Sequence, residues 1–205
     1  MQGLANEIDL KWPNDLVARG RKLGGILVEA ARDNEGKPFA VCGIGVNVNY
    51  VPSEVPDGGL PAIGLSDLNE NVPAVDMLLD EVYHAVVNAV DAWAEHLNAK
   101  EEDAGPLAPV HDEYIAHLNW IGKHVIARSP AGDEQARGIF KTVDTFGRAC
   151  IETEDGLRSF HFEEASPAPL GRIGRRSHLL SSITRRSKPI MQTKEPRYRN
   201  GSGAL

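Results

Sequence analysis

Two short runs of this 205-residue sequence place polar and cationic side chains inside otherwise apolar, strand-like sequence. The first is Lys11-Trp12-Pro13-Asn14-Asp15, and the second is Lys22-Leu23-Gly24-Gly25-Ile26-Leu27. A lysine on a buried strand needs an anionic partner, because a desolvated and unpaired ammonium is costly. Neighbouring glycines remove side chains that would keep a ligand away from the backbone. Together the two runs predict a site for an anionic ligand.

A third run, Gly43-Ile44-Gly45-Val46-Asn47, places two more glycines and an amide at the end of an apolar strand. It is not a dinucleotide-binding fingerprint, because the third glycine is absent and no helix is expected to begin there. Each run alone also has a plain structural interpretation. This would be an Asx turn for Asn14 and Asp15, a kink or bulge for the two glycines, and a strand-terminal cap for Asn47.

The elements that must position these runs form a β-meander. Alternating apolar residues and turn residues predict strands over residues 8–12, 16–18, 22–30 and 39–47. The connections are too short for parallel crossovers, so the strands must pair antiparallel. Residues 50–71, rich in Pro, Gly, Ser and Asp, then predict a long surface loop that is either a lid or a connector.

Helices and a small barrel follow the meander. Apolar residues at helical spacing predict an amphipathic helix from Val75 to Leu97, which should cover one face of the sheet, and a shorter helix from Val110 to Asn119. From Ile121 onward, short strands alternate with turns at a spacing typical of a β-barrel. The predicted barrel strands are residues 124–128, 135–143, 148–153 and 157–162. The predicted fold class is therefore α+β, with an antiparallel or mixed sheet packed by helices and then a small barrel.

Charge divides the chain into an acidic body and a basic tail. The whole chain has 22 basic and 29 acidic residues, and the segment from Gly171 to Leu205 holds nine of the basic residues and one of the acidic ones. The rest therefore carries 13 basic and 28 acidic residues, which is a net charge of −15. An acidic body argues against general nucleic-acid binding. The tail lacks hydrophobic periodicity, so we expect it to be disordered.

In this order and spacing, the three runs resemble the second half of the catalytic domain of biotin protein ligases, whose fold is shared with lipoate ligases. Motifs carry the resemblance from Leu10 to Asn49, and the order of elements extends it to Ala165. It implies a partial catalytic domain over residues 1–120, an SH3-like C-terminal domain over residues 121–168, and a tail over residues 169–205 that we expect to be disordered.

The resemblance implies an ATP-dependent ligase that uses biotin and Mg²⁺. Biotin and ATP would form biotinyl-5′-AMP, and a lysine of a biotin carboxyl carrier domain would then accept the biotin. Lys22 matches the catalytic lysine, whose ammonium would stabilise the charge of the transition state. The positions that match the biotin site are Lys22, Gly25, Leu27, Gly43 and Gly45. The positions that match the ATP site are Lys11, Asn14, Asp15 and Asn47, and Asp15 is also the candidate Mg²⁺ ligand.

Other chemistry-bearing residues have a structural interpretation. Trp12, Trp93 and Trp120 are predicted to be core or pocket-wall aromatics. Cys42 and Cys150 have no cysteine or histidine nearby at ligand spacing, so we expect reduced, partly buried thiols rather than a zinc site or a disulfide.

The sequence also departs from the pattern of a complete ligase of this family. A Gly-Arg-Gly-Arg type loop is expected well ahead of Lys11, but only ten residues precede Lys11 here. We therefore expect a truncated chain of weak or absent activity, with an uncovered apolar face and an open sheet edge through which a homodimer could pair. No DNA-binding domain, export signal or membrane segment is predicted, and we expect a cytoplasmic protein.

Two alternatives remain open at this point. One is a lipoate or octanoyl ligase or transferase of the same fold. The other is a catalytically inactive module that binds a carrier protein.

Overall fold

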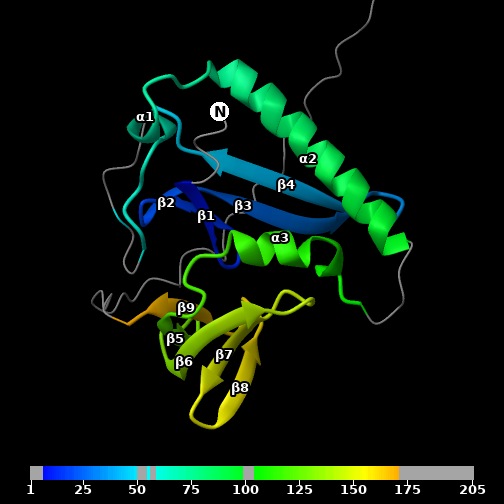
Figure 1. The fold of residues 1–205 in the computed structure, drawn as a ribbon. Coiled ribbons are helices and arrows are strands. Elements are labelled where there is room, and N and C mark those ends of the chain that lie inside the picture. The colour runs from blue at the N-terminus through cyan, green and yellow to red at the C-terminus, as the bar shows by residue number, and fades with distance from the viewer. Residues whose placement is uncertain (1–6, 50–54, 56–58, 99–103, 171–205) are drawn as a thin grey trace, which may run out of the picture.

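The computed structural model describes residues 7–49, 55, 59–98 and 104–170. Within these residues the chain forms two antiparallel sheets (Figure 1). A four-stranded sheet lies beside the long helix, and a five-stranded sheet forms the other end of the molecule, with a short helix between them. This arrangement confirms the predicted α+β class.

The first sheet is the predicted meander. Its strands are β1 (Ile8–Lys11), β2 (Asp15–Ala18), β3 (Arg21–Arg32) and β4 (Pro38–Val46), all antiparallel and in the order β1-β2-β3-β4. The connection between β2 and β3 is only Arg19-Gly20, with φ angles of 49° and 70°. Such a two-residue turn matches the twist of hairpin strands. It sets Ala18 opposite Arg21 and Val17 opposite Lys22, and a register shift between Leu16 and Val17 then places Asp15 opposite Gly25.

The described end of the predicted surface loop is held against the first sheet. The Lys22 N–H donates to the Pro61 carbonyl (2.7 Å), and the Ile63 N–H donates to the Lys22 carbonyl (2.9 Å). The chain then enters the short helix α1 (Leu65–Leu68). Here a small core cluster consists of Ala18, Leu23, Ile63 and Leu65. Most of residues 50–58 lie outside the described part of the chain.

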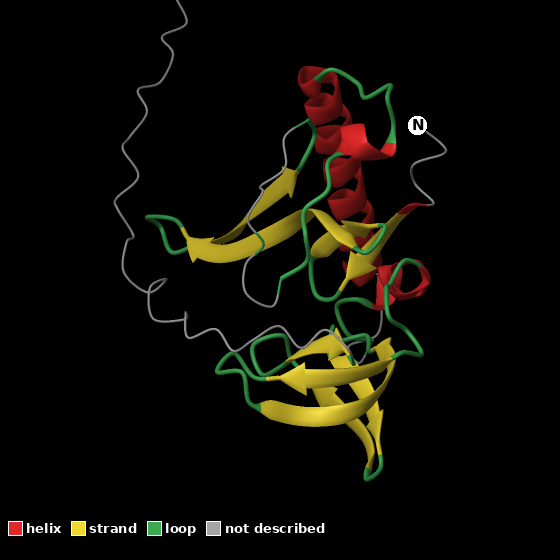
Figure 2. Cartoon of the chain, turned by 90° about the vertical axis from the view of Figure 1, so that its left-hand side faces the viewer, coloured by secondary structure: helices red, strands yellow, loops and turns green. Residues whose placement is uncertain are grey.

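Helix α2 (Val75–Asn98) is the predicted amphipathic helix, and it lies over the first sheet next to β4 (Figures 1 and 2). It does not seal that face. A groove of about 510 Å³ remains, lined by apolar side chains of α2 and β4. Several large apolar side chains of α2 are exposed, namely Val75, Met77, Leu79, Tyr83, Val87 and Val90. The predicted cover of the sheet is therefore only partial.

The second predicted helix ends earlier than expected. A 3₁₀ turn, η2 (Ala108–Val110), leads into α3 (His111–Ala116), and the next residues leave the helix. Instead, the Leu10 N–H donates to the His117 carbonyl, and the Asn119 N–H donates to the Leu10 carbonyl, both at 2.7 Å. The predicted extension to Asn119 is wrong because the outer edge of β1 offers these backbone groups partners, which outweighs local helix propensity.

The second sheet contains the four predicted barrel strands and one more. The strands are β5 (His124–Arg128), β6 (Glu134–Val143), β7 (Ala149–Thr153), β8 (Gly156–Phe160) and β9 (Ser166–Pro169), in the order β8-β7-β6-β5-β9. β9 was not predicted, because Pro167 and Pro169 disfavour a strand. Proline has no N–H to donate, and β9 lies at the sheet edge, where such residues are tolerated.

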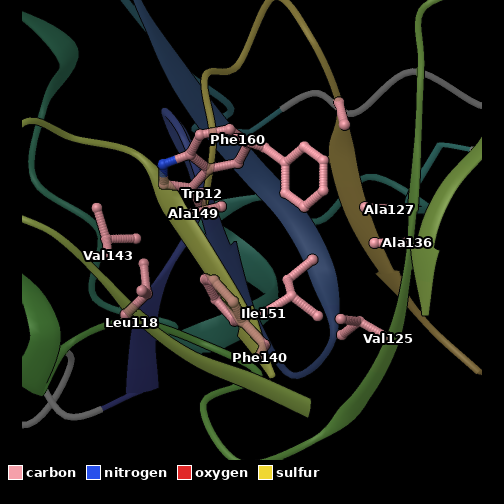
Figure 3. Packing of buried hydrophobic residues seen from close by; sticks show 11 residues of the cluster. Trp12, Leu118, Val125, Ala127, Ala136, Phe140, Val143, Ala149, Ile151 and Phe160 are labelled. Carbon is pink, nitrogen blue, oxygen red and sulfur yellow. The ribbon is translucent and has the colours of Figure 1, made fainter. Parts of the chain in front are cut away.

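The main hydrophobic core belongs to the second sheet but includes residues from outside it (Figure 3). Phe140, Val125 and Ile151 are completely buried there. Trp12, from the turn after β1, joins them with only 2% of its surface exposed, and so does Leu118. Because the two sheets share this core, the division at residue 120 into a partial catalytic domain and an SH3-like domain stays a prediction.

Three further expectations concern single features. The cysteines have no disulfide partner in the described residues, but Cys42 is exposed rather than partly buried, while Cys150 is buried. No helix in the described ranges is long and apolar enough to cross a membrane. The basic tail expected to be disordered lies, from residue 171, outside the described residues.

Candidate functional site

A pocket of about 600 Å³ opens where the turn after β1 meets β3 and the end of β4. The described end of the loop before α1 closes one side of it. Most of the predicted site residues line this pocket, namely Asn14, Asp15, Lys22, Gly25, Leu27, Gly45 and Asn47. Neither Lys11 nor Gly43 is among the lining residues. The structure thus brings the three sequence runs to one place.

The polar centre of the pocket is a carboxylate between two ammonium groups. Asp15 Oδ1 lies 2.5 Å from Lys22 Nζ, and Asp15 Oδ2 lies 2.9 Å from Lys11 Nζ. The side chain of Asp15 is only 17% exposed, whereas that of Lys22 is 45% exposed. The Lys22 ammonium is therefore held in place by Asp15 and remains accessible from the pocket.

The two lysines determine the ionisation of Asp15. Burial by itself would raise the pKa of Asp15, but the hydrogen bonds from Lys22 and Lys11 and their positive charges outweigh it and hold the pKa below its ordinary value. Asp15 is thus an anion at neutral pH. Two ammoniums and one carboxylate leave a net charge of +1, which suits an anionic ligand.

Gly24 and Gly25 differ in what a Cβ atom at each position would meet. A Cβ on Gly24 would lie 2.2 Å from the carbonyl oxygen of Gly45, a backbone atom of the neighbouring strand that cannot easily move. A Cβ on Gly25 would point into the pocket instead, 3.3 Å from Asp15 Oδ1 and 3.6 Å from Lys22 Nζ. Gly24 therefore permits the packing of β3 on β4, and Gly25 keeps the pocket floor open beside the ion pair.

The two asparagines hold the frame of the pocket through their side-chain amides. Asn14 Nδ2 donates to the Ile26 carbonyl (2.5 Å), and the Ile26 N–H donates back to the Asn14 carbonyl (2.9 Å). Asn47 Nδ2 donates to the carbonyls of Lys22 (3.3 Å) and Ile63 (3.1 Å). The Asn47 amide thus ties the end of β4 to β3 and to the segment before α1. This role is close to that of a strand-terminal cap, the plain structural interpretation of Asn47.

The remaining biotin-side positions lie along the β3–β4 pair. Gly25 pairs with Gly45, and Leu27 pairs with Gly43. Leu27 is 60% exposed although it lines the pocket, so it lies at the rim. A Cβ on Gly43 would meet only the Leu27 carbonyl, at 3.8 Å. Steric demand therefore does not explain a glycine at this position.

Sequence reasoning gave no site role to the residues that support the Lys11–Asp15 turn from outside. The Tyr114 hydroxyl, from α3, donates to the Pro13 carbonyl (3.0 Å), and burial raises the pKa of Tyr114 to about 12, so the donor keeps its proton. The ring of Trp120 lies 5.9 Å from Lys11 Nζ in cation–π geometry. No local pattern indicates these contacts, because the partners lie about a hundred residues apart in sequence.

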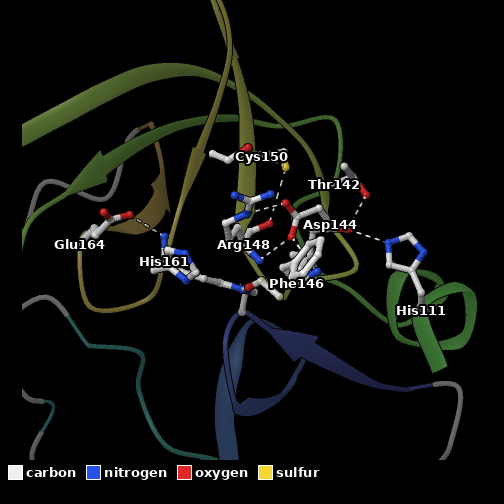
Figure 4. Close-up of polar contacts among 12 residues, drawn as sticks. His111, Thr142, Asp144, Phe146, Arg148, Cys150, His161 and Glu164 are labelled. Carbon is white, nitrogen blue, oxygen red and sulfur yellow. Dashed lines mark hydrogen bonds and ion pairs between the residues drawn. The ribbon is translucent and has the colours of Figure 1, made fainter. Parts of the chain in front are cut away.

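The turn between β6 and β7 supports the same region (Figure 4). Asp144 organises it: its Oδ1 accepts from the N–H groups of Phe146 and Arg148, and its Oδ2 accepts from Arg148 Nε at 2.7 Å. Gly147, at φ 82°, presents its carbonyl oxygen to Trp12 Nε1 at 3.0 Å. The turn thus fixes the acceptor that the buried indole of Trp12 uses.

The donors near the pocket fit a magnesium ion only in company with phosphates. The described residues contain no group of three or more His, Cys, Asp or Glu side chains that could hold a metal ion. Asp15 is one carboxylate, and both of its oxygens already face lysines. Mg²⁺ often binds through one or two carboxylates together with substrate phosphates. Asp15 would therefore supply at most one ligand to an ion that arrives with a nucleotide.

Comparison with known proteins identifies two matching family models. Residues 3–49 match the biotin/lipoate A/B protein ligase family, and residues 120–164 match the biotin protein ligase C terminal domain. The first match covers all three sequence runs, and the second covers β5 to β8.

Individual relatives agree with these matches. The biotin--[acetyl-CoA-carboxylase] ligase of Mycobacterium tuberculosis is 35% identical over 147 residues, which are 71% of this chain and 48% of that protein. The enzyme of the same name from Paracoccus denitrificans is 31% identical over 156 residues, which are 75% of this chain and 60% of that protein. The chain thus spans about half the length of these curated relatives.

Among solved structures, the biotin protein ligase from Aquifex aeolicus in complex with biotin and ATP is similar in fold. Its TM-score is 0.60 at 21% identity, and the match covers 80% of this chain and 62% of that chain. At this identity the likeness shows the fold.

Proposed function

The chain belongs to the biotin protein ligase family, and from that premise we propose that its pocket activates biotin with ATP and transfers it to a carrier lysine. A biotin carboxylate oxygen attacks the α-phosphorus of ATP, and pyrophosphate leaves. The amine of the carrier lysine then attacks the carbonyl carbon of biotinyl-5′-AMP, and AMP leaves. The new bond is an amide.

The observation that carries this proposal is the place of Lys22. Its ammonium lies in the pocket against Asp15, beside the open floor at Gly25, and is partly accessible. The first step brings two anions together, so its barrier is largely electrostatic. A preorganised ammonium that faces both the carboxylate and the α-phosphate stabilises the transition state without having to reorganise. We therefore assign Lys22 as the catalytic residue.

The other pocket residues divide into two sides. On the biotin side we place Gly25, Leu27, Gly43 and Gly45, where the β3–β4 backbone can be approached closely. On the ATP side we place the Lys11–Asp15 turn and Asn47. Asn47 would act mainly by holding the Lys22 backbone, since its amide already binds that carbonyl. Asp15 is the residue that would hold Mg²⁺, and the ion would supply positive charge to neutralise the departing pyrophosphate.

The C-terminal match favours biotin over lipoate as the substrate acid, because that model describes a domain of biotin protein ligases. We propose a biotin carboxyl carrier domain of a carboxylase as the acceptor, in line with the names of the relatives. We also propose a cytoplasmic location, where two unpaired cysteines remain reduced. The outer edge of β4, which pairs only with β3 among the described strands, is the edge through which a homodimer would pair.

The test is a biotinylation assay with the full 205-residue chain. Purified carrier domain is incubated with the chain, biotin and MgATP and probed with streptavidin, while lipoate and octanoate serve as competitors. Lys22→Ala is compared with Lys37→Ala, because Lys37 lies in the β3–β4 turn away from the pocket. Labelling that Lys22→Ala abolishes and Lys37→Ala preserves supports the proposal.

A parallel measurement separates loss of activity from a wrong assignment. Biotin and MgATP are titrated into the chain, and thermal stabilisation is recorded for the same two variants. Stabilisation that requires Lys22 but occurs without labelling would support the pocket assignment and count against the transfer step. Absence of both labelling and Lys22-dependent stabilisation would overturn the proposal.

A further inference from the structure

The turn that carries Asn14 and Asp15 into the pocket is anchored in the core of the other sheet. Trp12 belongs to the main hydrophobic cluster of the second sheet and is 2% exposed, whereas Asp15 lines the pocket of the first sheet. Only two residues separate them. A shift of the indole in its core would therefore move the carboxylate that holds Lys22.

Three contacts fix the turn, one each from the second sheet, from α3 and from Trp120 between α3 and β5. Trp12 Nε1 donates to the Gly147 carbonyl at 3.0 Å, across 135 residues of sequence. The Tyr114 hydroxyl donates to the Pro13 carbonyl at 3.0 Å. Trp120 lies over the ammonium of Lys11, which in turn binds Asp15. Each residue from Lys11 to Pro13 thus has an outside support.

The acceptor of the Trp12 hydrogen bond is itself rigidly held. Asp144 closes the β6–β7 turn with backbone and side-chain hydrogen bonds from Arg148, and the Gly147 N–H donates to the Asp144 carbonyl at 2.9 Å. The Leu107 N–H donates to the Thr145 carbonyl at 2.8 Å. A simple packing contact would not need an acceptor held from so many sides.

We propose that Trp12, its acceptor in the β6–β7 turn and Tyr114 are positioning residues, through which the second sheet sets the place of the Lys11–Asp15–Lys22 network in the pocket. None of these groups lines the pocket. The inference rests on the proposed function only where it gives the network a catalytic role. The juxtaposition itself can be tested without any catalysis.

The test follows the Lys22 ammonium directly. The full chain is labelled with ¹⁵N-lysine, and the side-chain ammonium signal of Lys22, assigned with Lys22→Arg, is observed by NMR at low temperature. Trp12→Phe keeps an aromatic ring in the core but removes the indole N–H. We expect the Lys22 signal to move toward that of exposed lysines and its protons to exchange faster with water, because Asp15 shifts when the indole tether is lost and no longer binds the Lys22 ammonium.

A matched control separates positioning from general loosening. Ile151→Val removes one methylene from the same core, and Ile151 is not among the residues that support the turn. It should lower the unfolding midpoint as well but leave the Lys22 signal unchanged. If Trp12→Phe does not fold, Tyr114→Phe removes the second tether with little change of volume. Its control is Tyr83→Phe on the exposed face of α2.

The outcomes decide the matter. The inference is overturned if the Lys22 signal stays unchanged in both tether variants, or if Ile151→Val moves it equally. Where the chain is active, kcat/KM for ATP should fall about tenfold in Trp12→Phe, since small misplacements of reacting groups have large effects on rate. A Lys22 signal that responds in a chain without ligase activity would retain the inference while the proposed function failed.

Discussion

Adjacent glycines in β3 should respond to the same substitution in opposite ways. Gly24→Ala places a methyl group 2.2 Å from the Gly45 carbonyl oxygen and 3.2 Å from the Val46 Cα. Both are backbone atoms of β4, so the strands must separate to admit it. Gly25→Ala places the methyl group against side-chain atoms of Asp15 and Lys22, the nearest at 3.3 Å, where a shift of a few tenths of an ångström suffices.

The magnitudes follow from these contacts. Forcing an extra methyl group into close-packed structure costs about 1–3 kcal/mol. For a chain of this size that lowers the Tm of Gly24→Ala by about 2–4 °C for each kcal/mol. Gly25→Ala lowers the conformational entropy of the unfolded chain, which stabilises the folded state by about 0.4–1 kcal/mol. This gain offsets the mild crowding in the pocket. Its effect should instead be on binding, where one misplaced methyl group typically costs about 10- to 100-fold in affinity.

The assay compares both variants in parallel. Chemical denaturation gives the free energy of unfolding, and titration with biotin and MgATP gives the affinity. We expect Gly24→Ala to lose stability and Gly25→Ala to keep stability but lose affinity. Equal loss of stability in the two variants would refute the assignment of Gly24 to packing and Gly25 to the pocket floor. Unchanged affinity in Gly25→Ala would show that the ligand does not reach this floor.

Three more predictions concern the polar network. Lys22→Ala should lower the rate of pyrophosphate release by about 100- to 1,000-fold while circular dichroism stays unchanged, since Lys11 still pairs with Asp15; near-normal release would remove Lys22 from the mechanism. The pKa of Asp15 is lowered in the folded state, so the stability that Asp15 contributes is complete above its unfolded pKa and is lost as pH falls through its folded pKa. An Asp15→Asn variant should therefore lose less stability than the parent chain below about pH 4. Identical acid-denaturation profiles for the two chains would contradict the network. Asn47→Ala leaves the Lys22 and Ile63 carbonyls without their amide donor. It should lower the free energy of unfolding, measured by denaturation, by about 1–3 kcal/mol. A change of less than about 0.5 kcal/mol, which is usual for surface substitutions, would mean that water replaces the amide.

The sequence predicts well those features that depend on neighbouring residues. The meander follows from alternating apolar residues and turns too short for any other pairing. This brings β2 and β3 together, but Asp15 lies opposite Gly25 only because of a register shift between Leu16 and Val17, which the pattern does not predict. The predicted strand over residues 124–128 has the bounds of β5, because the turn residues Ala131-Gly132-Asp133 separate it from the next strand. In each case the deciding interaction lies within a few residues.

The features that sequence reasoning missed depend on distant partners. Trp12 could be predicted as a core aromatic, but nothing local indicates that the core in question is that of the second sheet. The residues after Ala116 leave the helix because β1 offers an edge, and β9 forms because β5 does. Likewise, nothing local indicates that the amide of Asn47, at a strand end, binds the carbonyls of Lys22 and Ile63.

The local charge of the pocket also limits what kind of anion it can bind. The chain outside its basic tail carries a net charge of −15, whereas the Lys11–Asp15–Lys22 network carries +1. At physiological salt, screening confines the network's field to within about 8 Å. A long polyanion would extend beyond that range and meet a repulsive surface, while a carboxylate and a nucleotide phosphate fit within it. The same two lysines and one carboxylate that hold the network together thus favour small anions over nucleic acid, which agrees with the proposed function.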